Sequence, residues 1–114
     1  MISRYNKNER MSQVVEHNGT VILAGQLATD TTADTAGQTQ EILSRVEELL
    51  ALAGTNKSQL LSATIWISDM DDFTAMNDVW VGWIDAENPP VRACVRADLI
   101  TPDYKVEIQV TAVK

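Results

Sequence analysis

The residues with the clearest chemical potential lie in the last quarter of the chain, where Arg92, Cys94 and Glu107 occur on two stretches rich in apolar residues. An arginine presents a planar fork that binds a carboxylate through two hydrogen bonds, so Arg92 would select a small organic acid. A carboxylate in the same pocket, such as Glu107, polarises or deprotonates water as a general base. Asn77 is a candidate neighbour of this group.

Cys94 is a second candidate for covalent chemistry, but a cysteine attacks only as a thiolate helped by a nearby cation or histidine. Arg92 stands two residues away and would lower its pKa, whereas no histidine is placed to act as a base. The spacing also fits a plain ion pair between Arg92 and Glu107 on neighbouring strands. Spacing alone leaves both interpretations open.

Other polar and aromatic residues favour structural roles. His17 stands beside a predicted tight turn, where it is a solvated turn residue. The acidic residues between Asp69 and Asp72 are where a helix N-terminus favours negative charge, and this reading is preferred to a divalent-metal site. Trp80 and Trp83 stand three residues apart on a predicted helix and indicate core or interface packing rather than a stacking platform.

These residues are positioned by a predicted order of two strands, a helix, a strand, a helix and two strands. Asn18-Gly19 predicts a two-residue hairpin turn between the first two strands. Asp34 is expected to cap the first helix and Gly54 to end it. The predicted strands cover residues 14–17, 20–24, 60–67, 91–97 and 105–113, and the helices carry the apolar residues of 42–53 and 73–83. The order ββαβαββ predicts an α+β fold with two helices packed on one face of a single mixed sheet.

Alternation along the strands predicts which side chains share a face. In the last strand the apolar residues oppose Glu107, and in the preceding strand Ala93 and Val95 oppose Arg92 and Cys94. If the apolar faces lie under the helices, Arg92, Cys94 and Glu107 gather on the opposite face. That face also carries apolar residues such as Trp66, so an oligomer that covers it is expected.

Length and composition restrict the function. The 114 residues fit one domain, residues 1–114. Nine basic and sixteen acidic residues give a net charge of −7, which argues against binding to nucleic acid or an anionic membrane. One cysteine and one histidine exclude an intrachain disulfide and an ordinary zinc site, and no metal or other cofactor is expected. The polar N-terminus does not read as a signal peptide and no apolar run reaches the ~20 residues of a membrane span, so a cytoplasmic location is expected.

Five segments carry a resemblance to a known family. They are Val-Ile-Leu-Ala-Gly-Gln at 21–26, Ile-Trp-Ile-Ser-Asp-Met-Asp-Asp-Phe at 65–73, Met-Asn at 76–77, Pro-Val-Arg-Ala-Cys at 90–94 and Val-Glu-Ile-Gln-Val-Thr-Ala at 106–112. In order and spacing they resemble the reactive-intermediate/imine deaminase (RidA) family, also called the YjgF/YER057c/UK114 or L-PSP endoribonuclease family.

The resemblance implies a chorismate-mutase-like fold assembled as a homotrimer with active sites in clefts between subunits. It implies hydrolysis of 2-imino acids, of the 2-iminopropanoate and 2-iminobutanoate type, to 2-keto acids and ammonia. Arg92 then matches the arginine that binds the substrate carboxylate, and Glu107 matches the glutamate that activates water. Cys94 and Asn77 match residues that line the substrate pocket. The alternatives are a non-catalytic carboxylate-binding or chaperone-like trimer and, for some members, an endoribonuclease.

Two positions depart from the characterised deaminases of that family. Those proteins have a tyrosine where this chain has Met11, and a serine where it has Ala24. The segment around Met11 resembles a subfamily that keeps the arginine and alters the pocket mouth. Since both changes remove a polar group, they predict a more apolar pocket that favours a bulkier substrate.

Overall fold

The computed structural model describes all of residues 1–114. The strands are β1 (Ser3–Lys7), β2 (Ser12–His17), β3 (Thr20–Leu23), β4 (Gln26–Leu27), β5 (Leu60–Ile67), β6 (Val91–Arg96) and β7 (Val106–Val113), and the helices are α1 (Thr35–Leu52) and α2 (Phe73–Trp83). Short 3₁₀ turns at Lys57–Gln59 and Met70–Asp72 precede β5 and α2. Neither helix combines the length and apolarity needed to cross a membrane.

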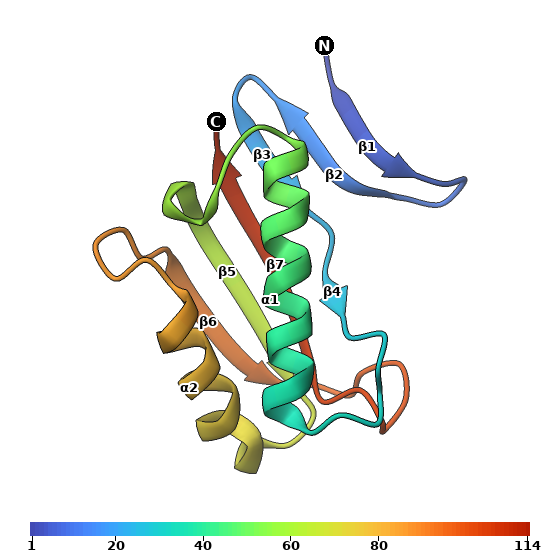
Figure 1. The fold of residues 1–114 in the computed structure, drawn as a ribbon. Helices are drawn as coiled ribbons and strands as arrows, with labels where there is room; N and C mark the ends of the chain where they lie inside the picture. Colours follow the sequence, from blue (N-terminus) through green and yellow to red (C-terminus); the bar gives the residue numbers. More distant parts are fainter.

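The seven strands form one mixed sheet in the order β1-β2-β3-β7-β5-β6, with β4 paired to β7 beside β3. Strands β5 and β6 run parallel, and the other pairs are antiparallel. Both helices lie on the same face of the sheet, with α2 in front of β6 in Figure 1. The predicted α+β fold with two helices on one face is therefore confirmed.

The core lies between the helices and the central strands. Alternate residues of β7 are buried, namely Val106, Ile108, Val110 and Ala112. The apolar stripe of α1, formed by Ile42, Leu43, Val46, Leu49 and Leu50, is buried as well. The burial of one face of β7 leaves Glu107 on the other face of the sheet, which we call the open face.

The predicted hairpin turn and the predicted ends of α1 are confirmed. Asn18 and Gly19 have φ angles of 51° and 83°, as a hairpin turn with two left-handed residues requires. The Asp34 side chain accepts a hydrogen bond from the Gly37 N–H at 2.8 Å and caps α1. Gly54 follows the last turn of α1 with φ 83°. Asp69 caps the 3₁₀ turn before α2 rather than α2 itself, because its carboxylate accepts from the Asp71 N–H at 2.9 Å.

Two strands were not predicted. β1 is a polar stretch at the sheet edge, and its register with β2 pairs Arg4 with Val15 and Tyr5 with Val14. It lacks the β-branched residues that indicate a strand, and its pairing with β2 supplies the backbone hydrogen bonds instead. β4 has only two residues and follows Ala24 and Gly25, where the chain leaves β3 and rejoins the sheet beside β7.

Candidate functional site

Arg92 lies on β6, at the free edge of the sheet, and its guanidinium reaches over α2. Its Nη1 donates a hydrogen bond of 2.7 Å to Oδ1 of Asn77. Its Cζ lies 5.9 Å from the centre of the Phe73 ring and 5.6 Å from that of the Trp80 ring. These contacts combine a hydrogen bond with two cation–π interactions and hold the guanidinium against α2.

Sequence reasoning expected Asn77 near Arg92, and the structure confirms this contact. It predicted core or interface packing for Trp80. Trp80 is indeed 5% exposed, but its ring also contacts the guanidinium. Phe73 was expected only as one of the apolar residues of this helix. A usable signal was present, because Phe73, Asn77 and Trp80 recur at four- and three-residue spacing and therefore share one face of α2.

The predicted face of Arg92 and Cys94 is wrong. The parallel register of β5 and β6 pairs Arg92 with Ala63 and Cys94 with Ile65. Ala63 and Ile65 are buried beneath the helices, and paired residues of neighbouring strands share a face. Arg92 and Cys94 therefore lie on the helix face, while their apolar neighbours on β6 lie on the open face.

The error has a physical cause. Alternation shows that Arg92 and Cys94 oppose Val95, but not which of the two sets faces the helices. β6 is an edge strand, and the side of α2 that it meets offers aromatic rings and an amide, which accommodate an arginine. Val95, 45% exposed, lies on the open face opposite Trp66.

The guanidinium of Arg92 has no acidic partner in the chain. The four ion pairs join Arg10 to Glu9, Arg45 to Glu41, Lys57 to Glu47 and Lys114 to Glu16. Arg92 is exposed and is held by a neutral amide and two rings. Among the five basic side chains that form no ion pair, Arg92 is the one held by side-chain contacts, so its charge is both oriented and free to bind an external carboxylate.

Glu107 lies on the open face, opposite Leu27 on β4 and Trp66 on β5. Its side chain is half-buried and takes part in none of the ion pairs. Burial raises the pKa of its carboxyl group above the ordinary value for a glutamate. A half-buried carboxylate with a raised pKa is a suitable proton acceptor for water near neutral pH.

Arg92 and Glu107 do not meet within one chain. β5 separates their strands, and the two side chains lie on opposite faces of the sheet. The alternative of a cross-strand ion pair between them is therefore wrong. One chain offers a candidate carboxylate-binding group at the edge of its helix face and a candidate base on its open face.

Cys94 lies beside Arg92 on the helix face and packs against the core. Burial raises the pKa of its thiol, and the positive charge of Arg92 offsets this only in part. The group is therefore a thiol at neutral pH, which favours a role in lining the site over nucleophilic attack.

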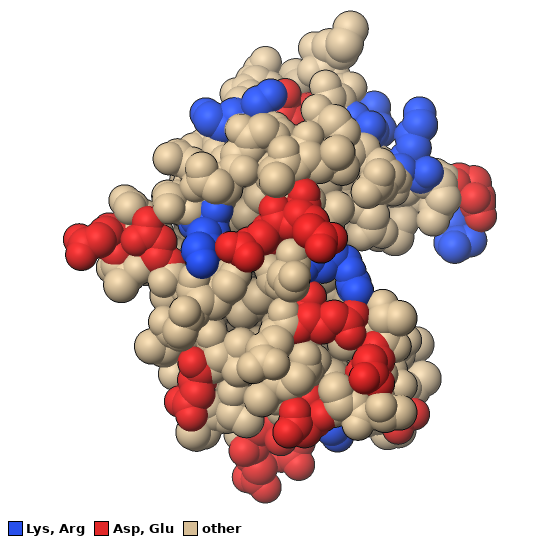
Figure 2. Space-filling view, in the orientation of Figure 1, with Lys and Arg blue, Asp and Glu red and all other residues tan.

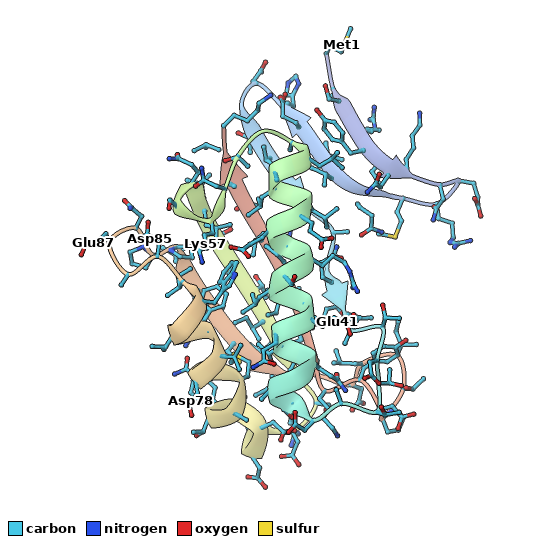
Figure 3. The ribbon with its side chains drawn as sticks, in the orientation of Figure 1. Met1, Glu41, Lys57, Asp78, Asp85 and Glu87 are labelled. Carbon is cyan, nitrogen blue, oxygen red and sulfur yellow. The ribbon has the colours of Figure 1, made fainter.

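The cavities of the single chain lie elsewhere. The largest, about 620 Å³, is a groove between α1 and α2 lined by residues such as Leu43, Val79 and Trp83. At one end of it Lys57 donates to the Trp83 carbonyl at 2.6 Å, and Figure 3 places this lysine near Asp85. The other two cavities, about 540 and 330 Å³, also exclude Arg92 and Glu107. A single chain therefore does not enclose the residues predicted to do chemistry.

Comparisons with known proteins extend over the whole chain. A family model described as Endoribonuclease L-PSP matches residues 1–114. A RutC family protein of Haemophilus ducreyi is 42% identical over 112 residues, which are 98% of this chain and 96% of that protein. The RutC family protein YoaB of Escherichia coli is 41% identical over 111 residues, which are 97% of this chain and 96% of the relative.

Solved structures show the same fold. NMB1025 of Neisseria meningitidis, described as a member of the YjgF protein family, is 38% identical and superposes with a TM-score of 0.97. The superposition covers 100% of this chain and 95% of that chain. The predicted chorismate-mutase-like fold is confirmed by this similarity.

Proposed function

This chain belongs to the endoribonuclease L-PSP family, also called the YjgF or RidA family, and on that premise we propose that it hydrolyses small 2-imino acids to 2-keto acids and ammonia. The observation that carries the proposal is Arg92, a fixed and exposed guanidinium without an acidic partner. A 2-imino acid presents a carboxylate one bond from the reacting carbon. Binding this carboxylate at Arg92 therefore also positions the carbon that water attacks.

Glu107 supplies the second function of the proposed site. It accepts a proton from water as the oxygen adds to C2 of the protonated imine, which gives a tetrahedral carbinolamine. It then returns this proton to the nitrogen, and the C–N bond breaks as ammonia leaves. The hydroxyl group on C2 loses its own proton to the departing ammonia through solvent water, so that C2 becomes the carbonyl carbon of the keto acid and the nitrogen ends as ammonium. The carboxylate is regenerated and no electrons are transferred. Because imines already hydrolyse in water, an oriented substrate and one activated water are sufficient for catalysis.

The placement of the two residues favours a site shared between subunits. Arg92 is at the edge of the helix face and Glu107 is on the open face, so a pocket that holds both takes them from different chains. The open face exposes Ile22 and Val95, at 44% and 45%, together with the partly buried Trp66. We propose that this face is the contact surface of a homotrimer, with Asn77 and Cys94 lining each intersubunit cleft beside Arg92.

Two features bear on substrates and location. Ala24 precedes Gly25, which is in contact with Glu107, and its lack of a hydroxyl leaves this wall of the pocket apolar. Imines with larger side chains are thus included in the proposed substrate range.

The acidic side chains spread across the helix face in Figure 2 would repel the phosphates of RNA, which disfavours a ribonuclease. The proposal keeps the cytoplasmic location expected from the sequence.

The test uses imines that an amino-acid oxidase generates in place from alanine, 2-aminobutyrate, leucine and phenylalanine. The wild-type protein should accelerate the release of ammonia. Arg92→Ala should lower kcat/KM at least about 100-fold, because hydrogen bonds between charged groups contribute about 1.5–3 kcal/mol each. Arg96→Ala is the matched control, since it removes the same charge from the same face of β6 and should keep the activity.

The outcomes separate the candidate functions. If the wild-type protein leaves the hydrolysis rate of all four imines unchanged, the deaminase proposal is wrong. Binding of pyruvate that depends on Arg92, without turnover of any imine, would instead indicate a non-catalytic carboxylate-binding protein. Cleavage of RNA that is lost with Arg92→Ala would indicate a ribonuclease that uses the same residue.

A further inference from the structure

We propose that Gly25 is the positioning residue for Glu107, and that its missing side chain provides the space in which the Glu107 carboxylate lies. This inference rests on the proposed function of Glu107 as the base that activates water. It adds to that function a role for Gly25, which lies between β3 and β4 and is 82 positions away from Glu107 in the sequence.

The geometry at Gly25 is unusually close. A Cβ atom built on Gly25 would lie 2.1 Å from Oε2, 3.1 Å from Cδ and 3.4 Å from Cγ of Glu107. Real Cβ atoms do not approach another heavy atom to 2.1 Å, so any side chain larger than hydrogen must displace the carboxylate by about 1 Å. The atoms in conflict form the free end of a flexible side chain, and rotation can relieve the conflict without moving the backbone.

The backbone conformation does not explain the glycine. Only Gly19 and Gly54 among the glycines have a positive φ, and both stand at chain reversals. Gly25 lies outside the left-handed region, so an alanine can adopt its backbone angles. The contact with Glu107 is thus the feature of this position that specifically requires a hydrogen in place of a side chain.

The main chain around Gly25 is fixed on both sides. The N–H of Ala24 donates to the Gln13 carbonyl at 2.9 Å. The buried Gln26 side chain donates to Gln13 Oε1 and to the Ala24 carbonyl, both at 2.9 Å. Leu27 then pairs directly with Glu107 on β7. These contacts therefore fix the main chain of Gly25 in its position next to the Glu107 carboxylate.

The contact between Gly25 and the Glu107 carboxylate has a chemical consequence. The main chain of Gly25 lies against one side of the Glu107 carboxylate, and no side chain of the same subunit forms an ion pair with it. The carboxylate is thus restricted to one region of the open face and remains free to accept a proton. A water molecule positioned for attack on C2 requires this restriction, because an error of about 1 Å at a reacting group costs about 100-fold in rate.

The experiment compares Gly25→Ala with Gly82→Ala. Gly82 lies on α2, has no atom within 4 Å of an added Cβ and is remote from Glu107, so Gly82→Ala should leave imine hydrolysis unchanged. Gly25→Ala should lower kcat about 100-fold and leave KM nearly unchanged, because the carboxylate-binding Arg92 is intact. Urea unfolding of both variants establishes that each is folded at the assay temperature.

Two further measurements distinguish positioning from a structural defect. The Glu107 carboxyl carbon, assigned by comparison with Glu107→Gln, is titrated by NMR in the wild type and in Gly25→Ala. Its pKa should fall toward the ordinary value in the variant, as the displaced group becomes more exposed. Glu107→Asp shortens the side chain by one methylene, so it should cost less activity in the Gly25→Ala background than in the wild type.

Each outcome decides between the two proposals. An unchanged Glu107 titration in folded Gly25→Ala overturns the positioning role, and so does an equal cost of Glu107→Asp in both backgrounds. A wild-type protein that does not hydrolyse imines overturns the proposed function instead. In that case the NMR titration still reports whether Gly25 places the carboxylate.

Discussion

At the scale of single residues, the site depends on how one arginine is held. A guanidinium fixed by a carboxylate is partly neutralised and binds a second carboxylate weakly. Arg92 is held by the Asn77 amide oxygen and by the faces of Phe73 and Trp80, which leave its charge intact. The neutral partners orient the guanidinium while they preserve its positive charge, which the proposed binding of a carboxylate requires.

Substitution of Cys94 tests whether the proposed site uses covalent chemistry. Burial raises the pKa of its thiol, so Cys94→Ala should lower kcat/KM for imines less than about tenfold, which corresponds to about 1.4 kcal/mol. The thiol should also react slowly with iodoacetamide at pH 7, since the thiolate is the reactive form. Cys94→Ser, which keeps nearly the same volume, controls for lost packing. A loss as large as that of Arg92→Ala would show that the sulfur takes part in the reaction.

At the scale of elements, the sequence determined the identity of the strands and helices better than their orientation. The alternation of β7 was sufficient to place Glu107, because β7 is central and one of its faces must be buried. The alternation of β6 was insufficient, because its apolar residues Val91, Ala93 and Val95 are exposed on the open face rather than buried beneath the helices. The parallel pairing with β5 decides the face of Arg92, and such pairing depends on chain topology rather than local composition.

The candidate site was predictable to a similar extent. Its residue types, and the expectation that Asn77 lies near this group, followed from the sequence and the family resemblance. The role of Gly25 did not, since a glycine between two strands normally indicates a bend or a close approach without identifying the partner. The partner, Glu107, is far away in the sequence, and only the pairing of β4 with β7 brings the two together.

The first half of α1 is attached to the chain after β4 by a carboxylate. Glu41 lies on the side of α1 that faces β4 (Figure 3), and it accepts hydrogen bonds from the N–H groups of Thr29 at 2.6 Å and Asp30 at 3.1 Å. These bonds, followed by one from Arg45, lower the pKa of Glu41 to about 2. The ionised carboxylate therefore joins α1 to the segment that carries β4 and, just before it, Gly25.

This attachment predicts a pH-dependent stability. Because the folded pKa of Glu41 lies below the unfolded value of about 4.3, its stabilisation is fully present above that value. It should be lost as the pH falls from there through about 2. Glu41→Gln should lower the free energy of unfolding by about 1 kcal/mol at pH 7. This difference should stay the same down to a pH of about 4 and become smaller at each lower pH.

Urea unfolding from pH 7 down to the lowest pH at which the protein stays folded measures this difference. Glu48→Gln is the control, since Glu48 is exposed on the same helix and should have little effect at any pH. A difference between wild type and Glu41→Gln that stays constant below pH 4 would contradict the assignment.

At the scale of the whole molecule, the two faces of the sheet carry different side chains. Figure 2 shows acidic side chains distributed over the helix face, while the open face carries exposed Ile22 and Val95 beside Trp66. A charged outer surface and an apolar inner face suit an assembly in which the sheets face one another. The same assembly would bring Arg92 of one subunit within reach of Glu107 of the next, so its formation and catalysis should be lost together.

Val95→Glu tests this coupling directly. The new carboxylate would be buried without a partner in the proposed interface, which costs more than the contacts between subunits can compensate. We expect a trimeric mass for the wild type by light scattering and a monomeric mass for Val95→Glu, with imine hydrolysis reduced at least about 100-fold because the shared site is incomplete. Leu52→Glu is the matched control, since Leu52 is 48% exposed against 45% for Val95 but lies at the end of α1. It should stay trimeric and active, whereas full activity in a monomeric Val95→Glu protein would show that one chain contains the complete site.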